Sequence, residues 1–484
     1  MTAIAKLDLD FLDAIPEVTY LVGGALRDLL LGRTPADIDL LVVGDIRRAA
    51  QHIAHRAGGR IVDIGKKGFT VKRIVSPETT IDITPLNHST IEDDLLQRDF
   101  TINAMAYAVH SRALIDCTGG MRDMRQKIIR LVSTTALEKD PVRLVRAYRM
   151  AASFEFSIDA GTRRAISRRR QLVNTVAGER IWAELVKIFN TSQSGAVIRG
   201  MADSGLLTAI FPEMQATIGC TQNRHHQFDV FEHSLRAYEH VEDLLNEFDA
   251  CFPAVAATAR KMDLGSHSAM LKYASLLHDI GKPATRQVDE AGRVHFYGHA
   301  AKSAAIGAGI SKRLRLSRHQ RDVADTLIRH HLRPLFLFIA SEKARLGKRG
   351  MVRFFNHCGS RTLPIVVHTM ADIMAKQQVL QGRDAHFIAF CGRLMAAYVD
   401  YIDRQSAAGP LINGNDLISV LGLSPSPLFK HLLARVDERR LSGELSSRDQ
   451  ALAWVRSYLI PKSENQGQAT ANGNPEPPRA KPEA

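Results

Sequence analysis

The chain has 484 residues, of which 45% are hydrophobic and 24% charged, a globular composition that excludes disorder over the whole length. Its 64 Lys and Arg residues outnumber its 51 Asp and Glu residues, and the formal net charge of +13 favours either a polyanionic partner or a basic solubilising surface. Five scattered cysteines without a CxxC pair argue against a disulfide framework, and no apolar run is long enough to span a membrane, so we expect a cytoplasmic protein.

The chain changes character at about residue 135. Residues 20 to 120 contain short runs rich in Val, Ile and Thr and separated by Gly or Pro, which predict the strands of one small mixed α/β domain. Beyond them apolar residues recur three and four positions apart, which predicts helices. We therefore expect an α+β protein with all-helical domains after its head. The expected parts are a head at 1–135, a neck at 136–215, a histidine-rich domain at 216–400, a C-terminal helical segment at 401–462 and a disordered tail at 463–484.

The first motif combines a glycine turn with paired carboxylates. Gly23 and Gly24 separate an apolar run from the helix-like LRDLLLG, and such a turn lets backbone N–H groups approach a phosphate. Asp37 and Asp39 follow in a strand-like run, where alternate residues share a face and two carboxylates repel one another without a cation between them. We interpret the pair as ligands of Mg²⁺ for nucleotidyl transfer, with a solvated strand end as the alternative. Asp82, on another apolar strand, is a candidate third ligand.

Two further motifs combine arginine with aspartate. The first is Arg98-Asp99-Phe-Thr-Ile-Asn103, and the second runs from Asp140 with arginines at three-residue intervals along one helix face. A stripe of arginines is commonly a solvated surface, but apolar residues cover the other side of this helix. Arginine and aspartate side chains can bind the edge of a base, and further guanidinium groups can hold a triphosphate.

Five segments between residues 18 and 215 carry a family resemblance. They are LVGGALRDLLLGRTPADIDL, QRDFTINAMAYAV, DCTGGMRDMRQKIIR, DPVRLVRAYRMAASFEFSID and GERIWAELVKIF. In this order they resemble the class II tRNA nucleotidyltransferase and bacterial poly(A) polymerase family. The resemblance implies a head whose Asp37 and Asp39 hold catalytic Mg²⁺, and a neck whose Asp140 and Arg143 select the incoming base. The nucleotide-binding residues that it implies are Gly24, Arg27, Arg98, Asp99, Asn103, Asp140, Arg143, Arg146 and Arg149.

Two departures from the family pattern bear on which nucleotide is added. Lys139 precedes Asp140, where the family usually has Glu. Only residues 85–91 separate the TIDIT strand from the acidic run that begins at Glu92, whereas family members that add the terminal A usually carry a longer loop there. Addition of CC alone therefore stays an alternative to addition of C and A, and poly(A) synthesis, which shares every head motif, is another.

A second constellation lies between residues 215 and 375, where histidines and aspartates occur in helix-like segments. Their convergence from several helices would build one or two metal sites. A His-Asp pair flanked by Leu-Leu and Ile-Gly-Lys resembles the HD-domain metal-dependent phosphohydrolases over about residues 225–375. The implied ligands of one ion are His233, His278, Asp279 and Asp372. The possible ligands of a second ion are His299 and His330.

These observations predict a template-independent nucleotidyltransferase that extends the 3′ end of tRNA or another RNA. Its substrates would be CTP and ATP, with Mg²⁺ in the head and either Mg²⁺ or a transition metal (Mn, Ni, Co or Fe) in the HD domain. The C-terminal segment from residue 409 resembles the family's tail, which contacts the tRNA body. An alternative of a different class makes phosphohydrolysis the main activity and the head a nucleotide sensor. No feature of the sequence specifies an oligomeric state.

Overall fold

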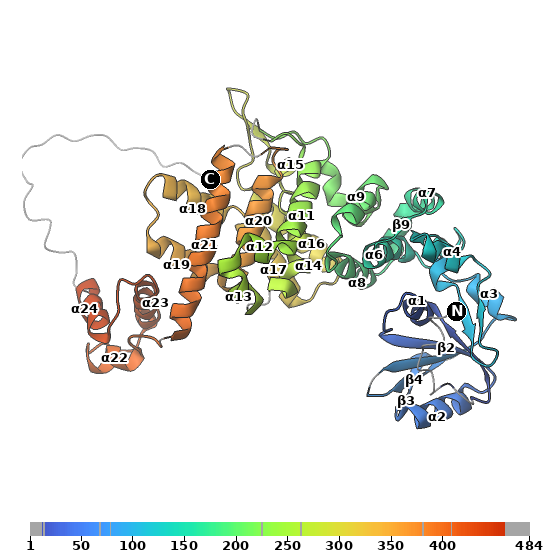
Figure 1. The fold of residues 1–484 in the computed structure, drawn as a ribbon. Helices are drawn as coiled ribbons and strands as arrows, with labels where there is room; N and C mark the ends of the chain where they lie inside the picture. Colours follow the sequence, from blue (N-terminus) through green and yellow to red (C-terminus); the bar gives the residue numbers. More distant parts are fainter. Residues whose placement is uncertain are drawn as a thin grey trace, which may run out of the picture. The chain divides into compact units, whose positions relative to one another are not determined.

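The computed structural model of the chain divides into two compact units (Figure 1). The first comprises residues 1–334 and 363–389, and the second comprises residues 335–362 and 390–484. The structure describes residues 12, 15–66, 69–77, 79–223, 226–261, 264–379, 382–407 and 409–459. The predicted tail at 463–484 lies outside these residues. Within the described ranges, no helix combines the length and the apolar character that a bilayer crossing requires.

The head of the first unit is built on one seven-stranded sheet with the order β3-β4-β5-β2-β1-β6-β7. The strands are β1 Val18–Val22, β2 Asp37–Val43, β3 Arg60–Lys66, β4 Phe69–Val75, β5 Thr80–Pro85, β6 Ala106–Ala108 and β7 Ala113–Ile115. β2 and β5 pair in parallel, whereas the other neighbours pair antiparallel. The expected mixed α/β head is therefore confirmed.

Helix α2 of the head begins and ends at capping residues. α2 is capped by Asp45, whose carboxylate accepts from the N–H of Arg47 at 2.8 Å, and it ends at Gly58 in the left-handed region. Buried residues of β1, β2, β6 and α3 form one apolar cluster against the sheet. The helices are α1 Gly23–Leu30, α2 Ile46–Ala57, α3 Ile91–Leu95, α4 Gly120–Arg125 and a 3-10 turn at Thr101–Asn103.

The neck is a run of helices with one small parallel strand pair, β8 Ile128–Ile129 and β9 Ser157–Ile158. α6 and α8 each bury one apolar face, as their spacing predicts; Leu144 and Ala147 on α6 and Trp182 and Leu185 on α8 are buried. The neck elements are α5 Ala136–Lys139, α6 Arg143–Phe154, α7 Ala160–Arg169, α8 Gly178–Phe189, α9 Gly195–Asp203, α10 Leu206–Ile210 and 3-10 turns at Arg170–Thr175 and Pro212–Thr217.

The histidine-rich part of the first unit is helical, with one short strand pair. Its elements are α11 Val230–Asn246, α12 Phe248–Cys251, α13 Pro253–Lys261, α14 Ser268–Leu277, α15 Lys282–Thr285, β10 Gln287–Val288, β11 Val294–His295, α16 His299–Arg313, α17 Arg318–His330 and α20 Thr362–Met374. The start of α8 lies close to the end of α16. A Cβ atom added to Gly178 would lie only 2.1 Å from the carbonyl oxygen of Arg313. Glycine is therefore required at this helix start.

A buried ion pair of the histidine-rich part also binds the start of a neck helix. Lys272 on α14 donates to Glu242 on α11 at 2.5 Å, and their side chains are 3% and 9% exposed. Glu242 also accepts from the backbone N–H groups of Ser194 and Gly195 at 2.7 and 2.8 Å, so it satisfies the start of α9. These bonds lower the pKa of Glu242 although burial opposes ionisation.

Glu242→Gln is expected to reduce the free energy of unfolding by about 3 kcal/mol, because it leaves the Lys272 ammonium buried without its counter-ion. Urea denaturation followed by circular dichroism measures the change. Glu247→Gln, an exposed site at the end of the same helix, serves as the control. An equal change in the free energy of unfolding of both variants would contradict the stabilising role assigned to the Glu242–Lys272 pair.

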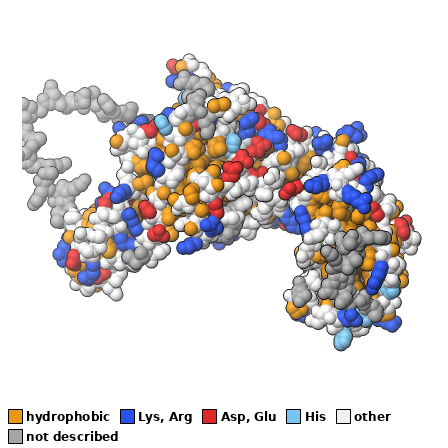
Figure 2. All heavy atoms as spheres, in the orientation of Figure 1, with side chains coloured by type: hydrophobic (Ala, Val, Ile, Leu, Met, Phe, Trp, Pro, Cys, Tyr) orange, Lys and Arg blue, Asp and Glu red, His pale blue; other side chains and the backbone are white. Residues whose placement is uncertain are grey.

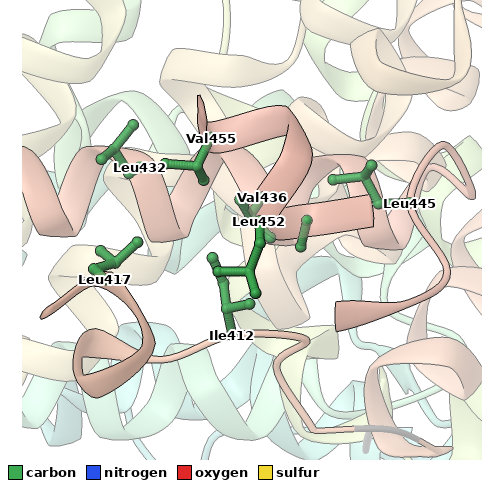
Figure 3. Close-up of a cluster of buried hydrophobic side chains, with 8 residues drawn as sticks. Ile412, Leu417, Leu432, Val436, Leu445, Leu452 and Val455 are labelled. Carbon is green, nitrogen blue, oxygen red and sulfur yellow. The ribbon is translucent and has the colours of Figure 1, made fainter. Parts of the chain in front are cut away.

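The second unit carries its own apolar core at the C-terminal end (Figure 3). Ile412, Leu417, Leu432, Val436 and Leu452 come from α22, α23, α24 and the segment before them, and all are buried. α22 begins with a capping box in which Asn413 and Asp416 exchange hydrogen bonds. The helices of this unit are α19 Lys348–Cys358, α22 Gly414–Ser419, α23 Pro427–Leu441 and α24 Arg448–Leu459. α18 Arg333–Glu342 and α21 Gly382–Ala407 begin with residues of the first unit and continue into the second.

Candidate active sites

The two aspartates of the DxD motif lie on the same face of β2. Asp37 and Asp39 are exposed, whereas Ile38 and Leu40 between and beyond them are buried, which is the alternation that a strand imposes. The parallel register with β5 places Asp82 directly opposite Asp39. Partial desolvation and then repulsion from Asp82 raise the pKa of Asp39, and Arg98 opposes this rise. A cation at this face would relieve that repulsion.

Asp82 already has a cationic partner. Arg73 on β4 donates to both of its carboxylate oxygens at 2.7 Å, a bidentate pair. No group of three metal-ligand atoms within 4.8 Å of one another occurs around Asp37 and Asp39 in the described residues. Asp82 thus lies beside Asp37 and Asp39 as the bidentate partner of Arg73.

The glycine turn borders this carboxylate face. Gly23 has a φ of +69°, and a Cβ there would lie 3.0 Å from the Arg98 guanidinium and 3.5 Å from the Asp39 carboxylate. Gly24 follows at the start of α1, where Val22 provides no side-chain cap. The backbone N–H groups of this first turn are thus available to a phosphate. Arg98 is held beside them by Asp94, at 2.9 Å from its Nε.

Arg27, Asp99 and Asn103 form one hydrogen-bonded chain. Arg27 donates to the Asn103 side-chain oxygen at 2.6 Å and to Asp28 at 2.8 and 2.9 Å, and its guanidinium lies 4.4 Å from the ring centre of Phe154. Asn103 in turn donates to Asp99 at 2.9 Å. Arg27 is 8% exposed. Its contacts are those of a residue that positions Asn103 and Asp99.

A buried glutamate organises the arginines of α6. Glu184 on α8 accepts from Arg149 at 2.6 Å and lies 3.5 Å from Arg146. Arg146 also reaches Asp99 of the head, at 3.4 Å. Arg146 and Arg149 are therefore turned toward carboxylates of two other segments and do not form a solvated stripe.

Glu184→Ala is expected to lower the free energy of unfolding by about 2–3 kcal/mol, because it leaves two partly buried guanidinium groups without their carboxylate. It should also weaken nucleotide binding, since Arg146 and Arg149 lose their fixed orientation. Urea denaturation and isothermal titration with CTP and ATP measure the two effects. Glu179→Ala, an exposed site at the start of the same helix, should change neither quantity.

The two residues expected to select the base have partners in the neck and head. Asp140 accepts from Arg180 with both carboxylate oxygens at 3.0 Å. Arg143 donates to the carbonyl oxygens of Gln97 and Ala136 at 3.4 and 3.3 Å. Lys139, which stands where the family usually has Glu, donates to the side-chain oxygen of Gln97. Gln97 therefore connects this edge of the neck to the Arg98 motif of the head.

In the histidine-rich part, the residues predicted to bind one metal ion converge. The ligand atoms of His233, His278, Asp279 and Asp372 all lie within 4.8 Å of one another, and all four residues are buried. His233 Nε2 lies 2.9 Å from Asp372 and 3.4 Å from Asp279. Burial opposes a charge on His278, yet the two aspartates outweigh it and raise its pKa to about 10. The cluster therefore stabilises positive charge at its centre, as a metal site must.

A second group of ligand atoms shares Asp279 with the first. It contains His299 and His331, and not His330, which the sequence analysis named. His331 is fully buried, whereas His330 is half-buried at the last residue of α17. Side chains of successive helix residues point about 100° apart. His330 and His331 therefore cannot both point toward His299. The structure corrects the candidate ligand from His330 to His331.

The orientation of three histidines fits metal binding. The Nδ1 atoms of His278, His299 and His331 lie 2.8, 2.8 and 2.7 Å from the carbonyl oxygens of Ser275, Phe296 and Ile328. A carbonyl only accepts, so each Nδ1 carries a proton, and in the neutral ring Nε2 then presents a lone pair. The Nε2 atoms of His278 and His299 face the buried carboxylate of Asp279 at 3.2 and 3.4 Å, and Lys282 Nζ lies 2.5 Å from the same carboxylate.

Residues beyond the sequence predictions complete both sites. Asp94 holds Arg98 in the head, and Glu184 holds Arg149 in the neck. His368, one helical turn before Asp372, packs its ring 5.0 Å from that of His278, and both of its nitrogens are buried without a partner among the described residues. The sequence could have indicated His368, because it stands four residues before Asp372 and residues at that spacing share a helix face.

Comparisons with known proteins agree with this geometry. Three family matches follow the chain in order: the poly A polymerase head domain over residues 19–130, the probable RNA and SrmB-binding site of polymerase A over residues 155–218, and the HD domain over residues 230–348. A solved CCA-adding enzyme of Thermotoga maritima complexed with tRNA matches with a TM-score of 0.65 at 21% identity, and the match covers 95% of this chain and 98% of that one. This likeness confirms the fold.

Two curated relatives match over nearly their whole length. The CC-adding tRNA nucleotidyltransferase of Thermus thermophilus is 28% identical, with 97% of this chain and 99% of that protein covered. The A-adding tRNA nucleotidyltransferase of Deinococcus radiodurans is 31% identical, with 92% of this chain and 97% of that protein covered. The chain therefore belongs to the tRNA nucleotidyltransferase family, with a poly A polymerase head, a polymerase RNA-binding region and an HD domain.

Proposed function

We propose that the protein is a template-independent nucleotidyltransferase that adds C, A or both to the 3′ end of tRNA from CTP and ATP. One observation carries this proposal: Asp37 and Asp39 share a strand face that borders the Gly23 turn and Arg98. Concentrated carboxylates beside groups suited to phosphate imply a cation between protein and triphosphate. The activities named for the relatives support the same conclusion.

In the proposed reaction the 3′-hydroxyl oxygen attacks the α-phosphorus, and the bond from that phosphorus to the β-phosphate bridging oxygen breaks to release pyrophosphate. Asp37 and Asp39 would hold Mg²⁺, which supplies charge neutralisation for the attacking and leaving oxygens. The first turn of α1 and Arg98 bind phosphate oxygens. Asp140 and Arg143 read the base, while Arg146 and Arg149 hold the nucleotide in the orientation set by Glu184 and Asp99.

The connection between β5 and α3 is short, residues 86–90, so CC addition alone is an alternative form of this activity. The test is incubation of the purified protein and Mg²⁺ with tRNA transcripts that end before CCA, after C and after CC, followed by sequencing of the 3′ ends. Products that stop at CC identify a C-adding enzyme, and completion to CCA identifies the full activity. Long A tails would overturn the proposal in favour of poly(A) synthesis.

A second activity, metal-dependent hydrolysis of phosphoesters, is favoured by the buried HD cluster, which we define as His233, His278, Asp279, His299, His331 and Asp372. A divalent ion, of Mn, Ni, Co, Fe or Mg, would be held by these residues and would supply Lewis acidity toward water and phosphate oxygens. Lys282, whose Nζ lies 2.5 Å from Asp279, would neutralise a phosphate. Elemental analysis of the purified protein, with hydrolysis assays after chelation and reloading by each metal, tests this activity.

The proposal also covers the domain boundaries and the cellular location of the protein. We assign the head, neck, HD and C-terminal segments to residues 1–135, 136–215, 216–400 and 401–462, and we assign the protein to the cytoplasm, where its RNA substrate is made. Limited proteolysis with mass spectrometry tests the boundaries, since linkers between domains are cleaved first.

A further inference from the structure

Phe154, the last residue of α6, connects the neck to the head through two arginines. The guanidinium carbon of Arg27 lies 4.4 Å from the ring centre of Phe154, and that of Arg33 lies 4.9 Å from it. Arg33 also donates to the carbonyl oxygen of Ser153 at 3.1 Å. Both guanidinium groups are close enough for cation–π attraction, which acts within about 6 Å of a ring centre. The end of this neck helix therefore holds two cations of the head.

Arg27 differs from most basic residues of this part of the chain because it is buried. Figure 2 shows Lys and Arg side chains on the neck surface around α7, whereas Arg27 and Phe154 are both buried. Desolvation lowers the pKa of Arg27, and the carboxylate of Asp28 opposes this fall. A desolvated guanidinium gains more from an aromatic face than an exposed one does. The ring of Phe154 is therefore a substantial partner of this cation.

The same face of α6 holds both ends of the Asn103 side-chain amide. Met150 stands four residues before Phe154, so the two share a helix face, and its Sδ lies 3.6 Å from Asn103 Nδ2. Arg27, under the Phe154 ring, donates to Asn103 Oδ1 at 2.6 Å. Asn103 Nδ2 in turn donates to Asp99 at 2.9 Å. The neck helix thus fixes the orientation of this amide, directly at its nitrogen and through Arg27 at its oxygen.

We propose that Phe154 is a positioning residue for nucleotide addition: its ring face holds Arg27, and Arg27 holds the Asn103 amide in the orientation that nucleotide binding requires. The inference rests on the nucleotidyltransferase activity proposed above, and it specifies how the neck controls the head site. Because the ring acts through residues assigned to nucleotide binding, its weakening lowers the affinity for CTP and ATP more than the rate of the chemical step.

The test weakens the ring face with little change of its shape. Phe154 of the full-length protein is replaced by 4-fluoro-, 3,5-difluoro- and 3,4,5-trifluorophenylalanine, because each fluorine withdraws electron density from the ring face that attracts a cation. Isothermal titration with CTP and ATP measures the affinity, and single-turnover extension of a tRNA transcript at saturating CTP measures the rate. Each added fluorine should weaken binding, by about five-fold or more over the series, while the saturated rate stays within about two-fold of the parent rate.

Phe156 provides the matched control. It is as buried as Phe154, and the two ring centres lie 5.8 Å apart. Within the part of the chain that the structure describes, no cation lies over the ring of Phe156. The same fluorinated series at Phe156 should therefore change neither the affinity nor the rate. Equal losses of affinity at the two positions, or an affinity that stays constant along the Phe154 series, would overturn the proposal.

Arg33→Gln separates the contact with Arg27 from a general tether between neck and head. Arg33 is exposed, and it contacts the same ring and the carbonyl oxygen of Ser153. Its substitution should leave the affinity for CTP and ATP unchanged. A loss equal to that of the trifluorinated Phe154 protein would show that the ring serves as a tether, and would overturn the role assigned through Arg27.

The binding measurement also separates this inference from the activity on which it rests. If the unaltered protein binds CTP but adds no nucleotide to any transcript, the proposed nucleotidyltransferase activity fails, and the affinities of the Phe154 series then decide the role of the ring. If the unaltered protein binds neither CTP nor ATP, the positioning role fails as well.

Discussion

Asp37→Ala should reduce the rate of nucleotide addition by at least about a thousand-fold while leaving phosphoester hydrolysis at the HD cluster intact. The removed carboxylate is one of two on the β2 face that would hold Mg²⁺ against the triphosphate, and the loss of such charge stabilisation removes several kcal/mol from the transition state. Single-turnover extension of a labelled tRNA transcript with CTP measures the change. Because Asp37 is exposed on β2, the substitution should not disturb the fold.

The matched control is Asp93→Ala. Asp93 is an exposed aspartate of the same head, on α3, so the substitution makes the same charge change away from the β2 face. It should retain the parent rate. Addition that continues undiminished in a folded Asp37→Ala protein would show that the catalytic cation is held elsewhere.

Asp279→Asn should abolish phosphoester hydrolysis, with a loss of at least about a thousand-fold, and should release bound metal, while nucleotide addition continues. Asp279 is the one residue shared by both groups of candidate ligands, so its neutralisation weakens both positions at once. The amide keeps the shape of the side chain and limits the disturbance of the buried site. Metal content by mass spectrometry and the rate of phosphoester hydrolysis are the two measurements.

Asp322→Asn, an exposed site on α17, is the control for the charge change. A thermal melt of each variant shows whether the native fold persists, because Asp279 also faces Lys282 and His278. Simultaneous loss of both activities in a folded Asp37→Ala or Asp279→Asn protein would disprove two independent sites.

Local geometry made the strand carboxylates predictable. The side-chain period of a strand is two, so Asp37 and Asp39 had to share a face once the run was recognised as β-structure. The pairing of β5 with β2 was not predictable in this way, because parallel strands are joined by long connections and their register is set by packing. The position of Asp82 opposite Asp39, and its capture by Arg73 from a third strand, therefore required the structure.

Helical sites show the same limit. The order of His233, His278-Asp279 and Asp372 sufficed to predict that these four side chains converge. The choice between His330 and His331 depends on the rotation at the end of α17, and one residue changes the direction of a side chain by about 100°. Likewise Glu184, far along the chain from Arg149, contacts it only because α6 and α8 pack together. Periodicity predicted those two helices, but not which of their polar residues meet.

The contact between Lys139 and Gln97 bears on which substitutions position 139 tolerates. A primary amide carries an acceptor and a donor on one planar group, so half a turn of the Gln97 side chain exchanges the oxygen for the NH₂. The oxygen receives the ammonium of Lys139, and the NH₂ would equally serve a glutamate at position 139. Evolution can therefore reverse the charge at position 139 without a compensating change at position 97. Such a charge reversal alters the electrostatic potential beside Asp140, while the hydrogen bond between position 139 of the neck and Gln97 of the head is kept.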